Sequence, residues 1–410
     1  MIRQIRLKNF GWRRVALWLL LTKAIYLTLV YAAISMWPSM DETYRSTIHW
    51  PRESEPVLGS HFATWDGSHY LYLSEIGYSK DTPSCAFYPL WPLTIRWFSV
   101  FTGGSHLIAG ILLANVASLL AWIIFYHMVG QRFGEKVALW SLVLLIAFPG
   151  SLFYQFIYTE PIFFLLVMVL WLGLERERFD LAWIAASLLP LCRPSGIFCL
   201  LPIAWHLLTK RPPPWFGRIQ GWWLRRQGEA SSGEALANGL VKAKNAVHPY
   251  FLMLAPFLGW ATYFGLMWSW TGNPFEGFQA QRYWGVHSIT NLINVPKFLI
   301  GLFIPTEIHA FAGSLLDRCM FIVLLYTLPL IWRLGKDLLV WTYVLGIMPA
   351  MSGTFTSFTR YETTVFPMFI ALAVFFVGTK RRWPLIAFLI LSAVLHGILV
   401  WRFVNFRWAG

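Results

Sequence analysis

Apolar runs long enough to cross a bilayer recur from one end of this chain to the other, and they restrict its fold more than any other feature. A transmembrane helix needs about 20 mostly apolar residues. The pattern predicts an all-α membrane protein that crosses the bilayer many times, with about 10–12 transmembrane helices. The spans are expected near residues 15–37, 106–129, 137–154, 161–174, 249–270, 314–332, 337–352, 361–378 and 383–402, with a longer apolar segment at 181–208.

The composition supports this fold class. The chain is 57% hydrophobic and only 13% charged, whereas about a quarter of the residues in a soluble domain are charged. Three of the four cysteines lie in apolar surroundings and only Cys85 lies in a polar loop, so we expect no disulfide framework. The first apolar run has no cleavage site of small residues and is interpreted as an uncleaved first span.

The basic residues predict the orientation of the chain, because cytoplasmic loops of membrane proteins are enriched in Lys and Arg. With a cytoplasmic N-terminus, the basic N-terminal segment and the basic, Pro- and Gly-containing linker 209–248 both lie inside. This requires 181–208 to cross twice or turn back, and Arg193-Pro194 supplies the break. Membrane topology then explains the net charge of +14, so a nucleic-acid partner is unnecessary. We see no internal repeat and expect one transmembrane domain over 1–410.

The richest polar stretch lies at 64–78, inside a first loop at 38–105 that this topology places outside the cytoplasm. Tyr70, Leu73 and Ile76 recur at three-residue spacing, which is typical of one face of a helix. The pattern predicts an amphipathic helix at the membrane surface, with Asp66 at its N-terminal end.

The same topology gathers carboxylates and arginines on the outer side, as expected of an active site. Each also has a structural interpretation. In its structural interpretation, Asp66 only caps a helix. Arg193 in the same way only pairs with a lipid headgroup. Glu160 before Pro161 complements a helix dipole, while Arg360 and Glu362 anchor a span at its entrance.

Metal and nucleotide motifs are missing from the sequence. We find no His or Cys pairs at zinc spacing, no EF-hand loop and no Gly-rich phosphate cradle. We therefore expect no cofactor and, for any group transfer outside the cytoplasm, a donor carried by a lipid.

Two motifs of the first loop resemble the signature of the PIG-V-like mannosyltransferases, integral membrane glycosyltransferases of the GT-C class. They are Trp65-Asp66-Gly67-Ser68-His69-Tyr70-Leu71 with Ile76-Gly77-Tyr78, and Phe87-Tyr88-Pro89-Leu90-Trp91-Pro92-Leu93. Weaker likenesses are Phe148-Pro149 through Tyr158-Thr159-Glu160-Pro161, Arg193-Pro194-Ser195-Gly196, and Arg360-Tyr361 leading into Phe366-Pro367. The chain looks shorter than the eukaryotic members, which suggests a bacterial relative in a plasma membrane.

The resemblance implies a GT-C-like fold and transfer of a sugar, most often mannose, from a polyprenyl-phosphate donor to a glycolipid or glycan acceptor, with inversion. Asp66 would be the base that takes the acceptor's proton. Arg193 and then Arg360 would hold the leaving phosphate, and Glu160 would orient the sugar or the acceptor.

Further binding residues are expected from the first loop and from a lid-like outer loop between Asn273 and Lys297. The complete set of predicted substrate-binding residues is Arg193, Arg360, Glu160, Trp65, His69, Tyr70, Arg282, Trp284 and Glu362.

Non-enzymatic alternatives are a transporter or flippase of lipid-linked sugars, and a scaffold subunit of a membrane complex. Transporters place their binding groups near the midplane between repeats, whereas the deep positions here are nearly bare of charge.

Overall fold

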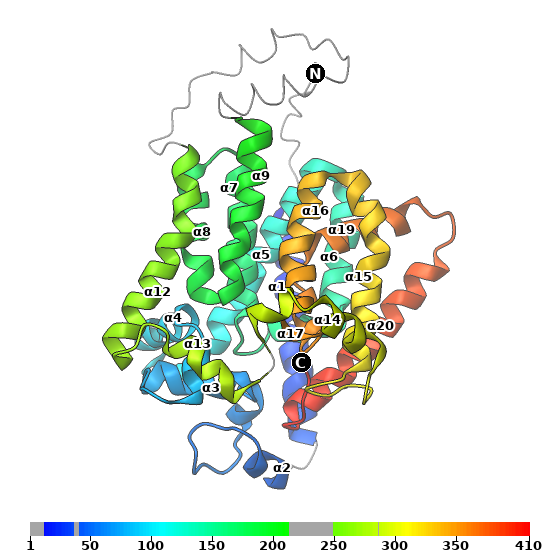
Figure 1. Cartoon of the computed structure of the whole chain (residues 1–410). Helices are drawn as coiled ribbons and strands as arrows, with labels where there is room; N and C mark the ends of the chain where they lie inside the picture. Colours follow the sequence, from blue (N-terminus) through cyan, green and yellow to red (C-terminus); the bar gives the residue numbers. More distant parts are fainter. Residues whose placement is uncertain (1–11, 37–40, 213–248, 286) are drawn as a thin grey trace.

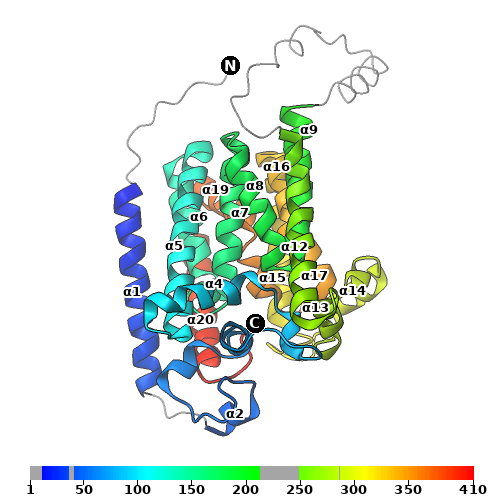
Figure 2. The same cartoon turned by 90° about the vertical axis from the view of Figure 1, so that its left-hand side faces the viewer.

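The computed structural model describes residues 12–36, 41–212, 249–285 and 287–410. Within them the chain is helical, and the long helices stand side by side as a bundle (Figures 1 and 2). Five of these helices are long and apolar enough to cross a membrane, which confirms the predicted all-α polytopic membrane fold. They are α1 (Trp12–Met36), α5 (His106–Phe133), α12 (Ala255–Thr271, extended back to Pro249 by a 3₁₀ turn), α15 (Leu315–Leu334) and α20 (Trp383–Val404).

The other predicted spans are helical but shorter than the roughly 20 residues that cross a bilayer unaided. They are α6 (Glu135–Ala147), α7 (Glu160–Glu175), α8 (Phe179–Cys192), α9 (Leu200–Lys210), α16 (Lys336–Thr342), α17 (Met348–Gly353) and α19 (Phe366–Gly378). Some are lengthened by tighter or wider turns: the 3₁₀ turn η4 (Pro149–Tyr154) follows α6, and a π-helical turn at Tyr343–Ile347 joins α16 to α17.

Small residues let the central helices approach closely. A Cβ on Gly173 of α7 would lie 2.8 Å from the Ala182 nitrogen of α8, and one on Gly259 of α12 would lie 2.2 Å from the Ser187 oxygen of α8. Close helix contacts at small residues are typical of membrane bundles. Around them pack fully buried aromatic side chains such as Phe164 and Trp171.

The predicted break at Arg193-Pro194 is present. Helix α8 ends at Cys192, a 3₁₀ turn spans Pro194–Cys199, and α9 then runs back to the upper end of the bundle (Figure 1). A Cβ on Gly196 would lie 2.2 Å from the Leu189 carbonyl, so the turn folds directly onto the end of α8. Residues 213–248 of the predicted linker and the basic residues Arg3, Arg6 and Lys8 lie outside the described residues.

The first loop gathers at one end of the bundle, the lower end in Figures 1 and 2. Its helical elements are α2 (Asp41–Ser46), η1 (Leu58–Phe62), α3 (Asp66–Glu75), η2 (Pro83–Ala86), α4 (Leu90–Ser99) and η3 (Val100–Thr102). The second loop at this end contains α13 (Glu276–Ala280), η7 (Gln281–Tyr283), η8 (Ile289–Leu292) and α14 (Val295–Phe303). Helix α18 (Phe358–Glu362) follows α17.

The prediction that 66–77 is a helix lying on the membrane surface is wrong. Helix α3 begins at Asp66 as expected, but it is enclosed: Tyr70 and Leu73 are buried, and so are Ser68, His69, Leu71 and Ser74. Ile76, expected on the apolar face, is 60% exposed. Three-residue spacing identified one buried face and gave no information about the others.

The exposed apolar surface of the first loop is formed instead by α4 and by the turn η3 that follows it. Trp91 and Ile95 are buried against the bundle, while Trp97, Val100 and Phe101 are each more than three-quarters exposed. Large aromatic and apolar side chains on such a face suit the boundary between headgroups and acyl chains.

Candidate active site

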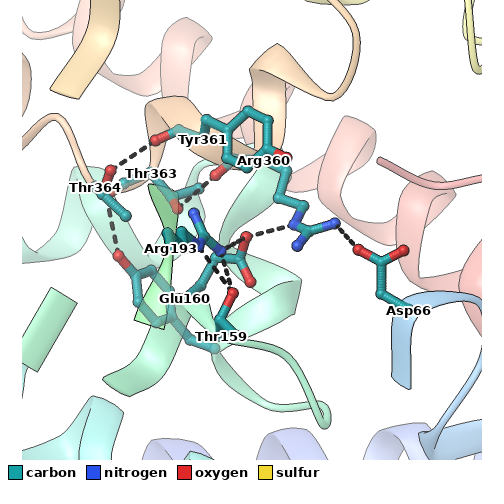
Figure 3. A network of polar contacts seen from close by, with 9 residues as sticks. Asp66, Thr159, Glu160, Arg193, Arg360, Tyr361, Thr363 and Thr364 are labelled. Carbon is teal, nitrogen blue, oxygen red and sulfur yellow. Dashed lines mark hydrogen bonds and ion pairs between the residues drawn. The ribbon is translucent and has the colours of Figure 1, made fainter. Parts of the chain in front are cut away.

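Four segments that are distant in sequence bring their charged side chains together (Figure 3). Arg360 donates from Nη1 to Asp66 Oδ2 at 2.5 Å and from Nε to Glu160 Oε1. Arg193 is paired through Nη2 with the same Glu160 oxygen. The result is a continuous chain of alternating charges, Asp66–Arg360–Glu160–Arg193, which we call the ion chain.

Asp66 enters the ion chain from the first turn of α3. The residue before it, Trp65, holds the N-cap position with φ 54° and ψ −118° and makes no side-chain capping bond. A positive φ is strained for a residue with a large side chain. Because Trp65 holds the N-cap position, Asp66 is the first residue of the helix itself. Its carboxylate accepts a hydrogen bond from Arg360. The interpretation of Asp66 as the N-cap is wrong.

Glu160 lies at the centre of the ion chain and is fully buried at the start of α7. Taking an isolated carboxylate out of water is costly, and paired cations must offset that cost. Two guanidiniums share its Oε1 atom, whereas Oε2 has no hydrogen-bond partner within the described residues.

Arg193 is fixed by its neighbours on both sides. Its backbone is extended, at φ −152° and ψ 149°, because the following Pro194 disfavours the helical conformation. The Thr159 hydroxyl accepts from Arg193 Nε at 2.8 Å and from Nη2 at 2.6 Å. The guanidinium carbon also lies 5.1 Å from the ring centroids of Phe163 and Tyr361.

Arg360 follows a strained turn. Thr354, Phe355 and Ser357 all have positive φ, at 47°, 72° and 58°, a conformation that side-chain-bearing residues keep only when their surroundings impose it. One such restraint is Asp317, at the start of α15: its Oδ1 accepts from the Thr359 backbone nitrogen at 2.8 Å and from the Thr359 hydroxyl at 2.5 Å. This anchors the residue immediately before Arg360.

Aromatic rings support the Arg360 guanidinium. Its carbon lies 4.5 Å from the Tyr158 ring centroid, 5.3 Å from Phe153 and 5.4 Å from Tyr361. Cation–π contacts of this kind orient a guanidinium and strengthen when water is excluded. The Tyr158 hydroxyl in turn donates to the Thr64 carbonyl at 3.1 Å, which ties α7's approach segment to the start of α3.

Exposure distinguishes the members of the ion chain. The Asp66 side chain is 18% exposed, Arg193 10%, Arg360 4% and Glu160 0%. Among the described residues, Arg193 Nη1 and Arg360 Nη2 have no hydrogen-bond partner. A ligand would therefore meet the Asp66 carboxylate and two partly satisfied guanidiniums.

Several predicted binding residues lie around α3 but outside the ion chain. Trp65 contacts Trp408 edge-on, with ring centroids 5.3 Å apart. The Tyr70 ring is buried, 6.4 Å from that of Tyr158. Trp284 meets His69 edge-on at 5.1 Å, so the second loop does reach over α3 as a lid would.

His69 is buried, stacked on Phe87 with centroids 4.6 Å apart, and its Nδ1 lies 2.8 Å from the Ser84 hydroxyl. Burial lowers the pKa of His69 to about 4, although the negative charge of Asp66 opposes the shift. His69 is therefore neutral near pH 7.

Arg282 and Glu362 are not brought into the ion chain. Arg282 is exposed and pairs with Asp81 at 3.3 Å and with the Tyr283 hydroxyl at 3.1 Å. Glu362 is fully buried, and neither of its carboxylate oxygens has a hydrogen-bond partner among the described residues. An anchoring role for Glu362 at the surface end of a span is thus wrong.

Other participants were predicted only as parts of larger segments: His287 within the outer loop between Asn273 and Lys297, and Tyr158, Thr159 and Tyr361 within the weaker family likenesses. Asp317 was not predicted from the sequence. The His287 ring meets Tyr361 edge-on at 5.6 Å. Burial lowers its pKa to about 4, and the positive charges of Arg360 and Arg193 act in the same direction. The available signal for Asp317 was a carboxylate beside an apolar run, which is usually functional.

Lys23 of α1, to which the sequence assigned no role, is also buried. It donates to Gln155 Oε1 at 2.8 Å and to Asn115 Oδ1 at 3.1 Å, and lies 4.3 Å from the Trp122 ring centroid. It connects the first span to the turn that leads into Thr159 and Glu160.

No cluster of three or more His, Cys, Asp or Glu side chains suited to a metal ion occurs within the described ranges.

Residues 19–207 match the model of a family described as mannosyltransferase (PIG-V), which confirms the sequence resemblance over that part of the chain. No curated protein matches the chain significantly in sequence.

Among solved structures, the chain is similar to ArnT from Cupriavidus metallidurans bound to undecaprenyl phosphate, with 15% identity and a TM-score of 0.49 over 92% of this chain and 64% of that one. It is also similar to the Archaeoglobus fulgidus oligosaccharyltransferase tethered to an acceptor peptide, with 13% identity and a TM-score of 0.45 over 96% and 55%. A third is AglB from the same organism with an inhibitory peptide and a dolichol-phosphate, at 12% identity and a TM-score of 0.44 over 95% and 56%. The chain thus spans less than two thirds of the length of these proteins.

Proposed function

We propose that this chain, which matches the mannosyltransferase (PIG-V) model over residues 19–207, is an integral membrane glycosyltransferase. It moves a sugar from a polyprenyl-phosphate carrier to a hydroxyl group of a glycan or glycolipid. The observation that carries the proposal is the partly exposed Asp66 carboxylate, 2.5 Å from Arg360 at the open end of a buried chain of ion pairs.

Asp66 acts as the general base. As the acceptor oxygen bonds to the anomeric carbon, the bond from that carbon to the phosphate oxygen breaks, and the electron pair leaves with the phosphate. The acceptor's proton passes to Asp66, and attack opposite the leaving group inverts the anomeric centre. A positioned base contributes roughly 10²- to 10⁴-fold to such a step.

Arg193 and Arg360 stabilise the leaving phosphate. Charge develops on that group in the transition state, where preorganised donors are most effective. Each guanidinium keeps one NH₂ group without a partner among the described residues, while Thr159 and Glu160 fix its plane. Planar guanidiniums suit phosphate oxygens geometrically.

Glu160 has a positioning role in this proposal. The sequence predicted that it orients the sugar or acceptor, but its carboxylate is fully buried and shared by both guanidiniums. That geometry suits a residue that holds Arg193 and Arg360 in register with each other.

The family description and the sequence support a choice of sugar, of membrane and of the side on which transfer occurs. The family description favours mannose as the transferred sugar. The Lys and Arg distribution favours an extracytoplasmic site, in one transmembrane domain over 1–410 in a bacterial plasma membrane. The alternative function as a transporter or flippase fits less well, because transporters bind their substrates between repeats and no internal repeat is visible in the sequence.

The test is sugar transfer from radiolabelled polyprenyl-phosphate-mannose to endogenous acceptors in membranes that carry wild type or Asp66→Asn. Asparagine preserves the side-chain shape but cannot take the proton. Transfer by wild type and its loss in an equally inserted variant supports the proposal. Equal transfer by both removes Asp66 as the base, and no transfer by wild type removes this donor.

A further inference from the structure

A cavity with aromatic and polar lining residues lies on the side of α3 that faces away from Asp66. Its volume is about 170 Å³. Ser68, Leu71 and Glu75 of α3 line it, and their spacing puts them on one helix face. Asp66 lies two residues before Ser68, so at 100° per residue its side chain leaves the opposite side of the helix.

The cavity wall is aromatic and is assembled from distant parts of the chain. Tyr44 and Trp50 of the first loop and Phe406 near the C-terminus line it. Tyr44 and Phe406 meet edge-on with centroids 4.9 Å apart, and Trp50 packs edge-on against Tyr72 at the same separation. These contacts fix the rings before any ligand enters.

An unpaired polar group also lines the cavity. Thr64 is only 3% exposed, and its hydroxyl oxygen has no hydrogen-bond partner within the described residues. Burying a hydroxyl without a partner is unfavourable, so a ligand that hydrogen-bonds to Thr64 recovers that free energy.

The remaining polar groups fit a neutral ligand with several hydroxyls. Glu55 and Glu75 line the cavity, and Glu75 already accepts from Trp50 Nε1 at 2.8 Å through Oε2. None of the described lining residues is Lys or Arg. The ring nitrogens of His49 face backbone oxygens of its own loop, with Nδ1 2.9 Å from the Thr47 carbonyl and Nε2 2.7 Å from the Arg52 carbonyl. Arg45, which is not a lining residue, already pairs with both oxygens of Glu55 at 3.1 and 3.0 Å. The lining carboxylates therefore disfavour a phosphate or another anion.

The volume limits the ligand further. At about 30 Å³ per water in the liquid, the cavity holds about six water molecules, well below the roughly 300–1,000 Å³ of pockets for drug-sized ligands. A single pyranose ring has this size, with an apolar C–H face for the aromatic wall and hydroxyls for Thr64 and the carboxylates.

We infer that this cavity is a carbohydrate subsite that holds one non-reacting pyranose of a glycan acceptor, behind the helix that carries the base. The inference rests on the proposed transfer to a glycan and adds a determinant of acceptor choice.

The test measures sugar binding separately from catalysis. The full chain is placed in phosphatidylglycerol nanodiscs, because maltoside detergents themselves contain pyranoses. Saturation-transfer NMR is recorded with methyl α-mannopyranoside, methyl α-glucopyranoside and methyl α-galactopyranoside. Variants are Trp50→Leu and Thr64→Val, with Trp50→Phe and Thr64→Ser as matched controls that keep the ring and the hydroxyl.

The expected result is that at least one sugar binds wild type and that its affinity falls about tenfold in Trp50→Leu and in Thr64→Val, in keeping with the loss of one aromatic or hydrogen-bonded contact. The two control variants keep most of the affinity. In transfer assays Trp50→Leu raises KM for the acceptor with kcat nearly unchanged, the signature of lost ground-state binding.

Asp66→Asn separates this inference from the proposed function, because it removes transfer and leaves sugar binding intact. Affinity that is unchanged in Trp50→Leu and Thr64→Val overturns the inference, as does the absence of binding by all three sugars. Preferential binding of choline, tested as a cationic competitor for the aromatic and carboxylate groups, overturns it too.

Discussion

Arg360 Nη1 lies 2.5 Å from Asp66 Oδ2, although 294 residues separate them in sequence. The pair joins the first loop to the segment that precedes α19, and Glu160 extends the contact into the bundle. Opposite charges held this close in a partly buried site restrain each other's orientation. Asp66 is thus presented from a helix whose other side chains are mostly buried.

Replacing Arg360 by lysine is expected to slow sugar transfer, unlike the same replacement at an exposed arginine. Arg360→Lys keeps the charge but loses the planar fork that bonds Asp66 and Glu160 at once. We expect kcat to fall about 100-fold, as for the loss of one preorganised donor to a developing charge. Single-turnover transfer from polyprenyl-phosphate-mannose measures the effect. Arg178→Lys, on an exposed side chain that pairs with Asp180 outside the ion chain, serves as the control and should transfer normally.

Glu160→Gln is expected to destabilise the protein as well as inactivate it. The change leaves Arg193 and Arg360 buried without the carboxylate they share, and breaking a buried ion pair on one side costs about 3–5 kcal/mol. Thermal unfolding in nanodiscs should show a clearly lower midpoint. Asp180→Asn, which breaks an exposed pair with Arg178, should leave the midpoint nearly unchanged. Equal midpoints for both variants would contradict the central position of Glu160.

Asp317 is expected to act as a positioning residue through Thr359. Its Oδ1 accepts two hydrogen bonds from Thr359, one of them from the backbone nitrogen, and these restrain the strained turn before Arg360. Asp317→Ala should lower kcat at least about tenfold with little change in KM. Asp317→Asn should restore most of the activity, because an amide oxygen accepts the same bonds. Failure of asparagine to rescue would mean that the negative charge, and not the hydrogen bonding, is what matters.

The fold and part of the site are accessible from the sequence for one physical reason. Burying charge next to apolar segments is costly, so the few charged residues found there are candidates for function. This argument identifies Arg193, whereas Asp66 was identified by the polar stretch at 64–78 and the family signature within it. Glu160 and Arg360 became candidates as charges at the ends of predicted spans on the outer side. Their pairing is not accessible in this way, because it depends on how α3, α7, α8 and α18 meet in space.

The errors have equally specific causes. The spacing of Tyr70, Leu73 and Ile76 identified one face of α3 but not the α4 and second-loop residues that cover the others. Arg282 and Glu362 were selected as charges near the predicted site. In the structure Arg282 is exposed and Glu362 is buried, neither is paired with a member of the ion chain, and their binding roles stay predictions. Where a charged loop residue lies depends more on tertiary packing than on the local sequence pattern.

The pH dependence of stability should reveal the burial of His69. Its pKa is lowered from 6.5 to about 4 mainly by burial, so the unfolded chain binds a proton at a higher pH than the native protein does. Between about pH 6.5 and pH 4 the unfolded state therefore holds more protons, and stability falls as the pH falls. The contribution is fully present above pH 6.5. At 1.36 kcal/mol per pH unit it amounts to roughly 3 kcal/mol across the window.

This effect is isolated by His69→Phe, which retains a ring to stack on Phe87 but does not titrate. Unfolding midpoints of wild type and variant are compared at pH 7.5 and pH 4.5, so that the contributions of the carboxylates cancel in the difference. Wild type should lose more stability on acidification than the variant. Parallel losses would mean that His69 becomes protonated in the native state near its ordinary pKa, and that its ring is open to water rather than sealed beneath Trp284.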